Sequence, residues 1–188
     1  ELEVPAVVDA DGLNNLADQP HVFREASDLV LTPHPGEASR LLDDPVGAIM
    51  ENPVEHIKKL VELTHQTVIL KASRPVIGHP LGAISVNVTG TPALAKAGSG
   101  DVLSGMIGGF LAQQVPPGPA ACLGTYLHGA AGRAAAREQP TTTVRSNDVI
   151  EHIPNAIEEF EQSGYPEWFP VKTESQHNEV LRWNPFPT

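Results

Sequence analysis

The residues with the clearest chemical potential lie in Asn87–Gly105, which reads NVTGTPALAKAGSGDVLSG. Here Gly98, Ser99 and Gly100 directly precede Asp101 and a run of apolar residues with helical spacing. Glycines leave backbone N–H groups unobstructed, and the start of a helix attracts anions. The helix dipole alone contributes only about 0.3–1 kcal/mol, so a phosphoryl group also needs direct N–H hydrogen bonds. The segment therefore predicts a phosphate cradle at the start of a helix.

Asp101 is an unexpected neighbour for such a cradle, because its carboxylate would repel a phosphate. One explanation is a first-turn aspartate that only stabilises its helix. The other is phosphoryl transfer to a hydroxyl. In that reaction a carboxylate orients the attacking O–H and accepts its proton, while N–H groups and a metal ion hold the phosphate charge. On the second interpretation Asp101 is the catalytic base.

The elements that must position these residues alternate between strands and helices. Short apolar runs predict strands at residues 6–9, 28–32, 67–70, 76–78 and 83–88. Helical spacing predicts helices at 36–42, 53–65, 101–115, 119–138 and 149–160. This order predicts a layered α/β fold over residues 1–162, with a mainly parallel sheet and a ligand site at the carboxyl ends of the strands. Residues 163–188 lack a period and are expected to form an irregular tail.

Three further segments follow predicted strands and should meet at that edge of the sheet. They are Asp9 with its neighbours, the stretch His34–Glu37, and Lys71. The sequence therefore predicts a site that combines these segments with the cradle.

Composition narrows the class of ligand. The 188 residues carry a net charge of −11, with no basic stripe to bind a nucleic-acid backbone, so a small-molecule partner is expected. The single cysteine, Cys122, excludes an intramolecular disulfide, and no apolar run is long enough to span a membrane. A soluble cytoplasmic protein is predicted.

The motifs also resemble a known family. GSGD followed by VLSGMIGG is similar to the GTGD signature of ribokinase-like kinases, whose aspartate is the base and whose glycines form an anion hole. The longer string TPALAKAGSGDVLSG, together with VVDADGLN, TPHPGEASRLL and YLHGAAG, resembles the ADP- or ATP-dependent NAD(P)H-hydrate dehydratases over residues 7–154. The resemblance implies a ribokinase-like three-layer α/β/α fold. The family's N-terminal strands have no counterpart before Glu1, so a complementing segment or a homo-oligomer is expected.

The resemblance also implies roles for individual residues. His34 would contact the hydrated nicotinamide, with Asp9, Asn87 and Asp101 completing the substrate site. Glu37 would hold Mg²⁺ through water, although it could equally be only a first-turn helix residue. The nucleotide-binding residues would be Lys71, Ala72, Ser73, Arg74, Pro75, Gly98, Ser99 and Gly100. Ala72 stands where the family usually has glycine and Pro75 where it has threonine, so the detailed nucleotide contacts here are open.

The implied activity repairs NADH or NADPH that has gained water on the nicotinamide ring. ADP or ATP, with Mg²⁺, would phosphorylate the ring hydroxyl, and phosphate would then leave. An epimerase that interconverts the hydrate isomers is the expected functional partner. Two alternatives remain: a sugar or vitamin-precursor kinase of the same fold, against which His34 counts, and a truncated nucleotide-binding module without activity.

Overall fold

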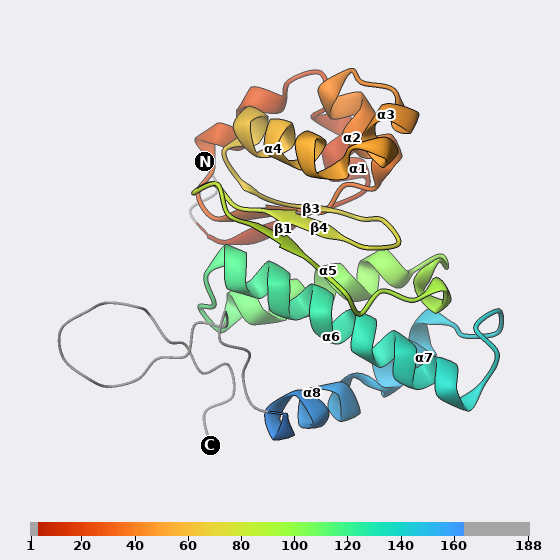
Figure 1. The fold of residues 1–188 in the computed structure, drawn as a ribbon. Helices are drawn as coiled ribbons and strands as arrows, with labels where there is room; N and C mark the ends of the chain where they lie inside the picture. Colours follow the sequence, from red (N-terminus) through yellow and green to blue (C-terminus); the bar gives the residue numbers. More distant parts are fainter. Residues whose placement is uncertain (1–3, 164–188) are drawn as a thin grey trace.

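The structure, a computed structural model, describes residues 4–163 and consists of one sheet between two layers of helices (Figure 1). The strands are β1 (Ala6–Val8), β2 (Leu29–Leu31), β3 (Thr67–Leu70), β4 (Val76–Gly78) and β5 (Ile84–Val86). All residues of β2, β3 and β4 are buried, which explains why, apart from Thr67, their sequences lack polar residues and do not alternate. The five predicted strands are confirmed.

The strands lie side by side in their order along the chain, β1-β2-β3-β4-β5. The pairs β1–β2 and β2–β3 are parallel, whereas β3–β4 and β4–β5 are antiparallel. Four strands therefore run in one direction and only β4 is reversed, in agreement with the expected mainly parallel sheet. Among the described residues β1 lies at one edge of the sheet and β5 at the other.

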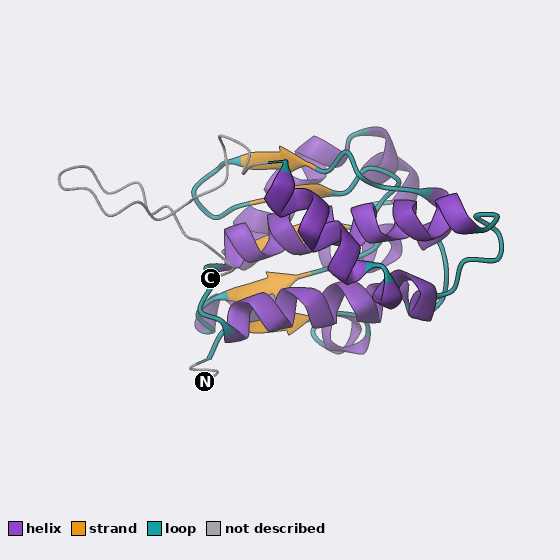
Figure 2. Cartoon of the chain, turned by 90° about the horizontal axis from the view of Figure 1, so that it is seen from below, coloured by secondary structure: helices purple, strands orange, loops and turns teal. Residues whose placement is uncertain are grey.

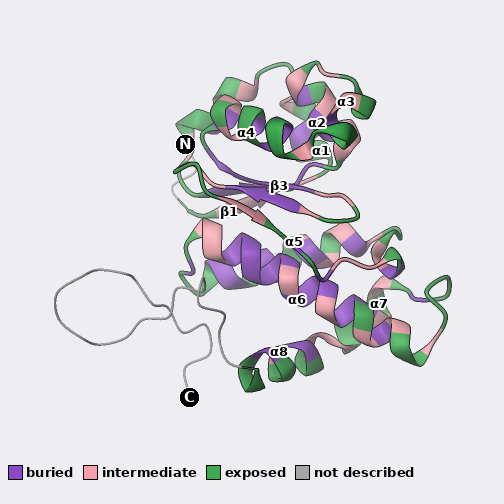
Figure 3. Ribbon diagram, in the orientation of Figure 1, coloured by how far each residue is buried: buried purple, intermediate pink, exposed green. Residues whose placement is uncertain are grey.

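One face of the sheet is covered by the helices between β1 and β3 (Figure 1). They are α1 (Asp11–Asn15), α2 (Pro35–Leu42), α3 (Val46–Glu51), α4 (Pro53–Thr64) and the 3₁₀ helix η1 (Pro20–Glu25). Their apolar sides form a core with the strands, which includes Leu13, Phe23, Leu31, Ile57 and Val68. Figure 3 shows buried residues concentrated on the strands and exposed residues on the outer side of α4.

The other face is covered by α5 (Ser99–Ala112) and α6 (Pro117–Glu138), and α7 (Ser146–Glu151) and α8 (Ile153–Gln162) pack beyond them (Figures 1 and 2). A short 3₁₀ helix, η2 (Pro92–Leu94), precedes α5. Much of α6 is buried, because the sheet and α5 lie on one side of it and α8 lies on the other. This arrangement gives the three-layer α/β/α fold.

The prediction of one helix over residues 149–160 was wrong, because α7 and α8 are separate helices with His152 between them. Pro154 has no backbone N–H to donate to the preceding turn, so a continuous helix would lose a hydrogen bond there. The tail predicted at 163–188 lies outside the described residues, apart from Ser163. Within residues 4–163, no helix is both long and apolar enough to cross a membrane.

Candidate active site

The carboxyl ends of β1, β2 and β3 bring the predicted segments together. Parallel pairing continues beyond the strands, since the Thr32 N–H donates to Val8 O at 3.1 Å and the Lys71 N–H donates to Pro33 O at 2.8 Å. Lys71 therefore lies beside the start of the His34–Glu37 stretch, and Asp9 follows Val8 at the same edge. The predicted meeting of these three segments is observed.

Four of the residues at this edge form a carboxylate–lysine cluster, consisting of Asp9, Glu37, Lys71 and Ser104. The Lys71 Nζ lies 2.5 Å from Asp9 Oδ1 and 3.9 Å from Glu37 Oε2, and Ser104 Oγ donates to Asp9 Oδ2 at 3.1 Å. Burial acts to raise the pKa of Asp9, but the hydrogen bond and charge of the Lys71 ammonium, together with hydrogen bonds from Thr32 and Ala10, outweigh burial, and the pKa lies below its ordinary value. Asp9 is thus an ionised carboxylate with both oxygens in use.

His34 and Glu37 cap the start of α2. His34 Nδ1 accepts the Gly36 N–H at 2.9 Å and the Glu37 N–H at 3.2 Å, while Glu37 Oε2 accepts the His34 N–H at 2.7 Å. This reciprocal capping box explains why these residue types stand three positions apart. The His34 side chain is still 51% exposed, so its ring remains accessible to a ligand. Its role in substrate binding stays a prediction.

The cradle at the start of α5 is less extensive than the sequence suggested. Gly98 adopts φ +81°, a conformation that favours glycine, and serves as the N-cap. The Ser99 N–H already donates to Lys96 O at 3.3 Å. The N–H groups of Gly98, Gly100 and Asp101 have no acceptor within residues 4–163. Those of Gly100 and Asp101 belong to the first turn of α5, so these two amides remain available to an anion at the start of the helix.

The Asp101 side chain is exposed on the first turn of α5. In the described part of the chain its carboxylate has neither a hydrogen-bond nor an ion-pair partner. The carboxylate of Asp101 is therefore neither sealed in the core nor neutralised by a neighbouring cation, as a base that meets a ligand requires.

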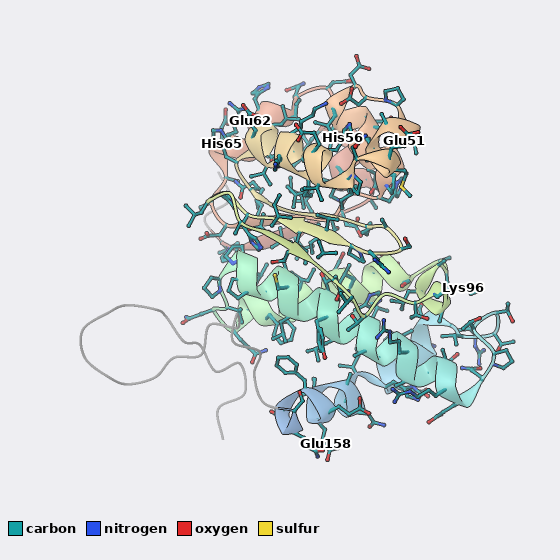
Figure 4. All side chains as sticks on the ribbon, viewed as in Figure 1. Glu51, His56, Glu62, His65, Lys96 and Glu158 are labelled. Carbon is teal, nitrogen blue, oxygen red and sulfur yellow. The ribbon has the colours of Figure 1, made fainter. Side chains whose placement is uncertain are left out.

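A cavity of about 700 Å³ adjoins both the cluster and the cradle, and we call it the Lys71 cavity. It is lined by Lys71, Ala72, Ser73, Pro75, Asn87, Gly90, Thr91, Pro92, Leu94, Ala95, Lys96, Ser99, Gly100, Leu103, Thr125 and His128. Gly100 brings the cradle into contact with the carboxylate–lysine cluster. A side-chain Cβ at this position would lie only 3.3 Å from Asp9 Oδ2 and 3.6 Å from Lys71 Nζ, so glycine allows the close approach. Figure 4 shows Lys96 at the end of the molecule where α5 begins.

Most of the predicted nucleotide-binding residues line this cavity, but not all of them. Arg74 is exposed and, like Gly98, does not contribute to the wall. Asn87 lines the cavity but is occupied by the protein: its Nδ2 donates to Thr125 O at 3.1 Å and its Oδ1 accepts from Thr89 Oγ1 at 2.9 Å. Asn87 therefore fixes the loop after β5 to α6, and its contact with substrate remains a prediction.

The sequence interpretation assigned no role to two residues that the structure places in the site. Ser104 supports Asp9, and the only signal was its position one helical turn after Gly100. His128 lies in the string YLHGAAG, and its Nε2 lies 3.2 Å from Ser99 Oγ. Burial lowers the pKa of His128 to about 4, so the ring is neutral at neutral pH.

Comparison with known proteins decides the family. The model of the NAD(P)H-hydrate dehydratase family matches residues 1–155. The chain belongs to the NAD(P)H-hydrate dehydratase family. The bifunctional NAD(P)H-hydrate repair enzyme Nnr of Moorella thermoacetica is 44% identical over 162 residues, which cover 86% of this chain and 31% of that enzyme.

Solved structures similar to this chain agree with the dehydratase family. The ADP/ATP-dependent NAD(P)H-hydrate dehydratase of Bacillus subtilis, co-crystallised with ATP/Mg²⁺, has a TM-score of 0.75 and 31% identity, covering 83% of this chain and 55% of that one. A ribokinase-like superfamily protein of Enterococcus faecalis has a TM-score of 0.66 and 26% identity, covering 82% and 52%. The ribokinase-like fold is thereby confirmed. The chain spans less than two thirds of each of these dehydratase relatives.

Proposed function

We propose that this member of the dehydratase family uses ADP or ATP to repair hydrated NADH and NADPH. The observation that carries the proposal is the exposed carboxylate of Asp101, which directly follows Gly100 at the start of α5. Asp101 does not itself line the 700 Å³ cavity, but Gly100 does. Small-molecule sites usually occupy about 300–1,000 Å³, so the cavity has a suitable size for a nucleotide. Within the described chain its wall contains Lys71 and Lys96 but no carboxylate, which favours an anionic ligand.

The chemistry follows from the poor leaving ability of hydroxide. Asp101 orients the hydroxyl of the hydrated ring and accepts its proton as the oxygen attacks the terminal phosphate of the donor. The N–H groups of Gly100 and Asp101 stabilise the charge on the transferring phosphoryl group. The bond between the transferred phosphorus and the rest of the donor breaks, and the shortened nucleotide leaves. The ring nitrogen lone pair then expels phosphate, which takes the electrons of the carbon–oxygen bond, and loss of a proton from the neighbouring ring carbon restores the double bond of the dihydronicotinamide.

The donor set fits a magnesium ion held largely by the nucleotide. Within residues 4–163 no group of three or more His, Cys, Asp or Glu side chains could hold a metal. Magnesium, however, is commonly bound by one or two carboxylates together with substrate phosphates and water. Both Glu37 oxygens already contact His34, so Glu37 would hold the ion only through water, as proposed from the sequence. When bound, magnesium would neutralise charge on the phosphates of the donor.

The remaining substrate contacts are part of the same proposal. We assign His34 and Asp9 to the side of the site that faces the hydrated nicotinamide, and the Lys71–Pro75 stretch to the nucleotide. The name of the Moorella thermoacetica relative, a bifunctional repair enzyme, supports a functional pairing with an epimerase. We also propose that a second copy of the chain, or a complementing segment, covers the edge of the sheet at β1. A cytoplasmic location is part of the same proposal.

The decisive experiment incubates the protein with hydrated NADH, magnesium and either ADP or ATP. Recovery of the dihydronicotinamide absorbance together with released phosphate would support the dehydratase. A stable phosphorylated sugar or vitamin precursor, formed when such compounds are offered instead, would identify a kinase. Nucleotide binding without turnover of either substrate would leave only a binding module.

A further inference from the structure

Ser99 and His128 form a buried polar pair on the wall of the Lys71 cavity. Ser99 is the first residue of α5 and His128 lies in the middle of α6, and Ser99 Oγ is 3.2 Å from His128 Nε2. Both residues are 6% exposed, and both line the cavity. Because Ser99 directly precedes Gly100, its hydroxyl lies beside the uncommitted amides of the cradle.

The pair leaves part of the hydroxyl's capacity unused. A serine hydroxyl has one proton to donate and two lone pairs, and the imidazole ring of His128 engages one of these. The neutral ring holds the hydroxyl without adding charge to the cavity wall. Ser99 lines the cavity, and within residues 4–163 no side chain other than His128 contacts its Oγ, so the rest of the hydroxyl's capacity is open to a ligand.

We propose that His128 is a positioning residue that aims the Ser99 hydroxyl at a phosphate group of the bound nucleotide. The inference rests on the proposed nucleotide binding and extends it by adding a side-chain ligand to the two amides. The relevant ligand class is a nucleoside diphosphate or triphosphate. His128 itself touches Ser99 and does not need to touch the reacting atoms.

A purely structural role for His128 makes a different prediction. If the ring only packs α6 against α5, its replacement would disturb the whole cavity and weaken adenosine and ADP alike. If the ring positions Ser99, only ligands that carry phosphate would lose affinity. The same difference applies to Ser99, whose hydroxyl would matter for ADP and not for adenosine.

The test measures binding of ADP and adenosine to the full chain by titration calorimetry, with magnesium present. His128→Phe keeps a ring but removes the nitrogen, whereas His128→Gln places an amide near the position of Nε2. Ser99→Ala removes the hydroxyl, and Ser99→Thr retains it. We expect ADP affinity to fall about tenfold or more in His128→Phe and Ser99→Ala, as loss of one hydrogen bond to a charged oxygen implies.

The matched variants, His128→Gln and Ser99→Thr, should bind ADP close to the wild-type level, and the double change His128→Phe with Ser99→Ala should be no weaker than either single change. Unchanged ADP affinity in Ser99→Ala, or equal losses for adenosine and ADP, would overturn the inference. The Ser99 variants answer the question even if His128→Phe fails to fold. A wild-type chain that binds ADP but repairs no hydrate refutes the proposed function alone, whereas one that binds no ADP refutes both.

Discussion

Asp9 lies close to Gly100 and Asp101 directly follows Gly100 in the chain, yet the two carboxylates have opposite surroundings. Asp9 accepts hydrogen bonds from Lys71 and Ser104, and its pKa is held below the ordinary value. Asp101 is exposed and has no such partner within the described residues. The comparison teaches that two carboxylates near the same glycine differ in how many oxygens remain free for a ligand, and this difference is why we propose Asp101, and not Asp9, as the base.

The largest effect should come from Asp101→Asn. Removal of a general base typically lowers turnover by about 10²–10⁴-fold, and the amide cannot accept the hydroxyl proton. Because Asp101 has no partner within residues 4–163, the free energy of unfolding should change by no more than about 0.5 kcal/mol. The measurements are hydrate repair and urea unfolding. Near-normal turnover in Asp101→Asn would show that Asp101 is not the base, and the proposed difference in role between Asp101 and Asp9 would be wrong.

Lys71→Met should act mainly on stability. It leaves the half-buried carboxylate of Asp9 without its cation, which we expect to cost about 1–3 kcal/mol in the free energy of unfolding. Lys58→Met, at an exposed position on α4, is the matched control and should change stability by no more than about 0.5 kcal/mol. Equal stability of the two variants in urea would show that the ion pair contributes little.

The pH dependence of stability should identify Asp9 as the ionised partner. Because the folded-state pKa is below the ordinary value of 3.8, the contribution of the pair is present above pH 3.8 and is lost as the pH falls through the folded-state pKa. Urea unfolding of wild type and Asp9→Asn should therefore differ most near neutral pH and converge in acid. A difference that does not vary with pH would contradict this assignment.

The smallest expected effect concerns Ser104, the second partner of Asp9. Ser104→Ala removes one hydrogen bond and should lower the free energy of unfolding by about 0.5–1.5 kcal/mol. Gly105→Ala is the neighbouring control, because a Cβ there meets nothing within 4 Å, and it should raise stability by about 0.5–1 kcal/mol. If both variants are more stable than wild type, the Ser104–Asp9 hydrogen bond contributes nothing to the free energy of unfolding.

The sequence was sufficient for features that depend on local pattern. The apolar runs identified all five strands, and the positions of Asp9, His34 and Lys71 after strands placed them at one edge of a parallel sheet. Gly98 and Asp101 marked the start of α5, because glycine is accepted at the N-cap and a first-turn acid is stabilised by the positive end of the helix dipole. The resemblance to the dehydratase family rested on these same segments.

Features that depend on contacts between distant segments could not be predicted in this way. The hydrogen bonds of Ser104 with Asp9 and of Ser99 with His128 join residues 95 and 29 positions apart. The Ser99 N–H donates to Lys96 O because of the way the chain turns before α5 begins. Arg74 lies outside the cavity because of the path of the loop after β3. Only the folded chain shows which donors are already used.

Helix α5 carries two features on consecutive turns: the uncommitted N–H groups of Gly100 and Asp101 at its start, and Ser104, which donates to Asp9 one turn later. A rotation of α5 large enough to turn its two open amides away from the cavity would also break the contact between Ser104 and Asp9. The hydrogen bond between Ser104 and Asp9 therefore restricts rotation of α5 relative to the sheet. If the chain binds a nucleotide as proposed, the two amides are already held in place, and binding energy need not be spent on positioning them.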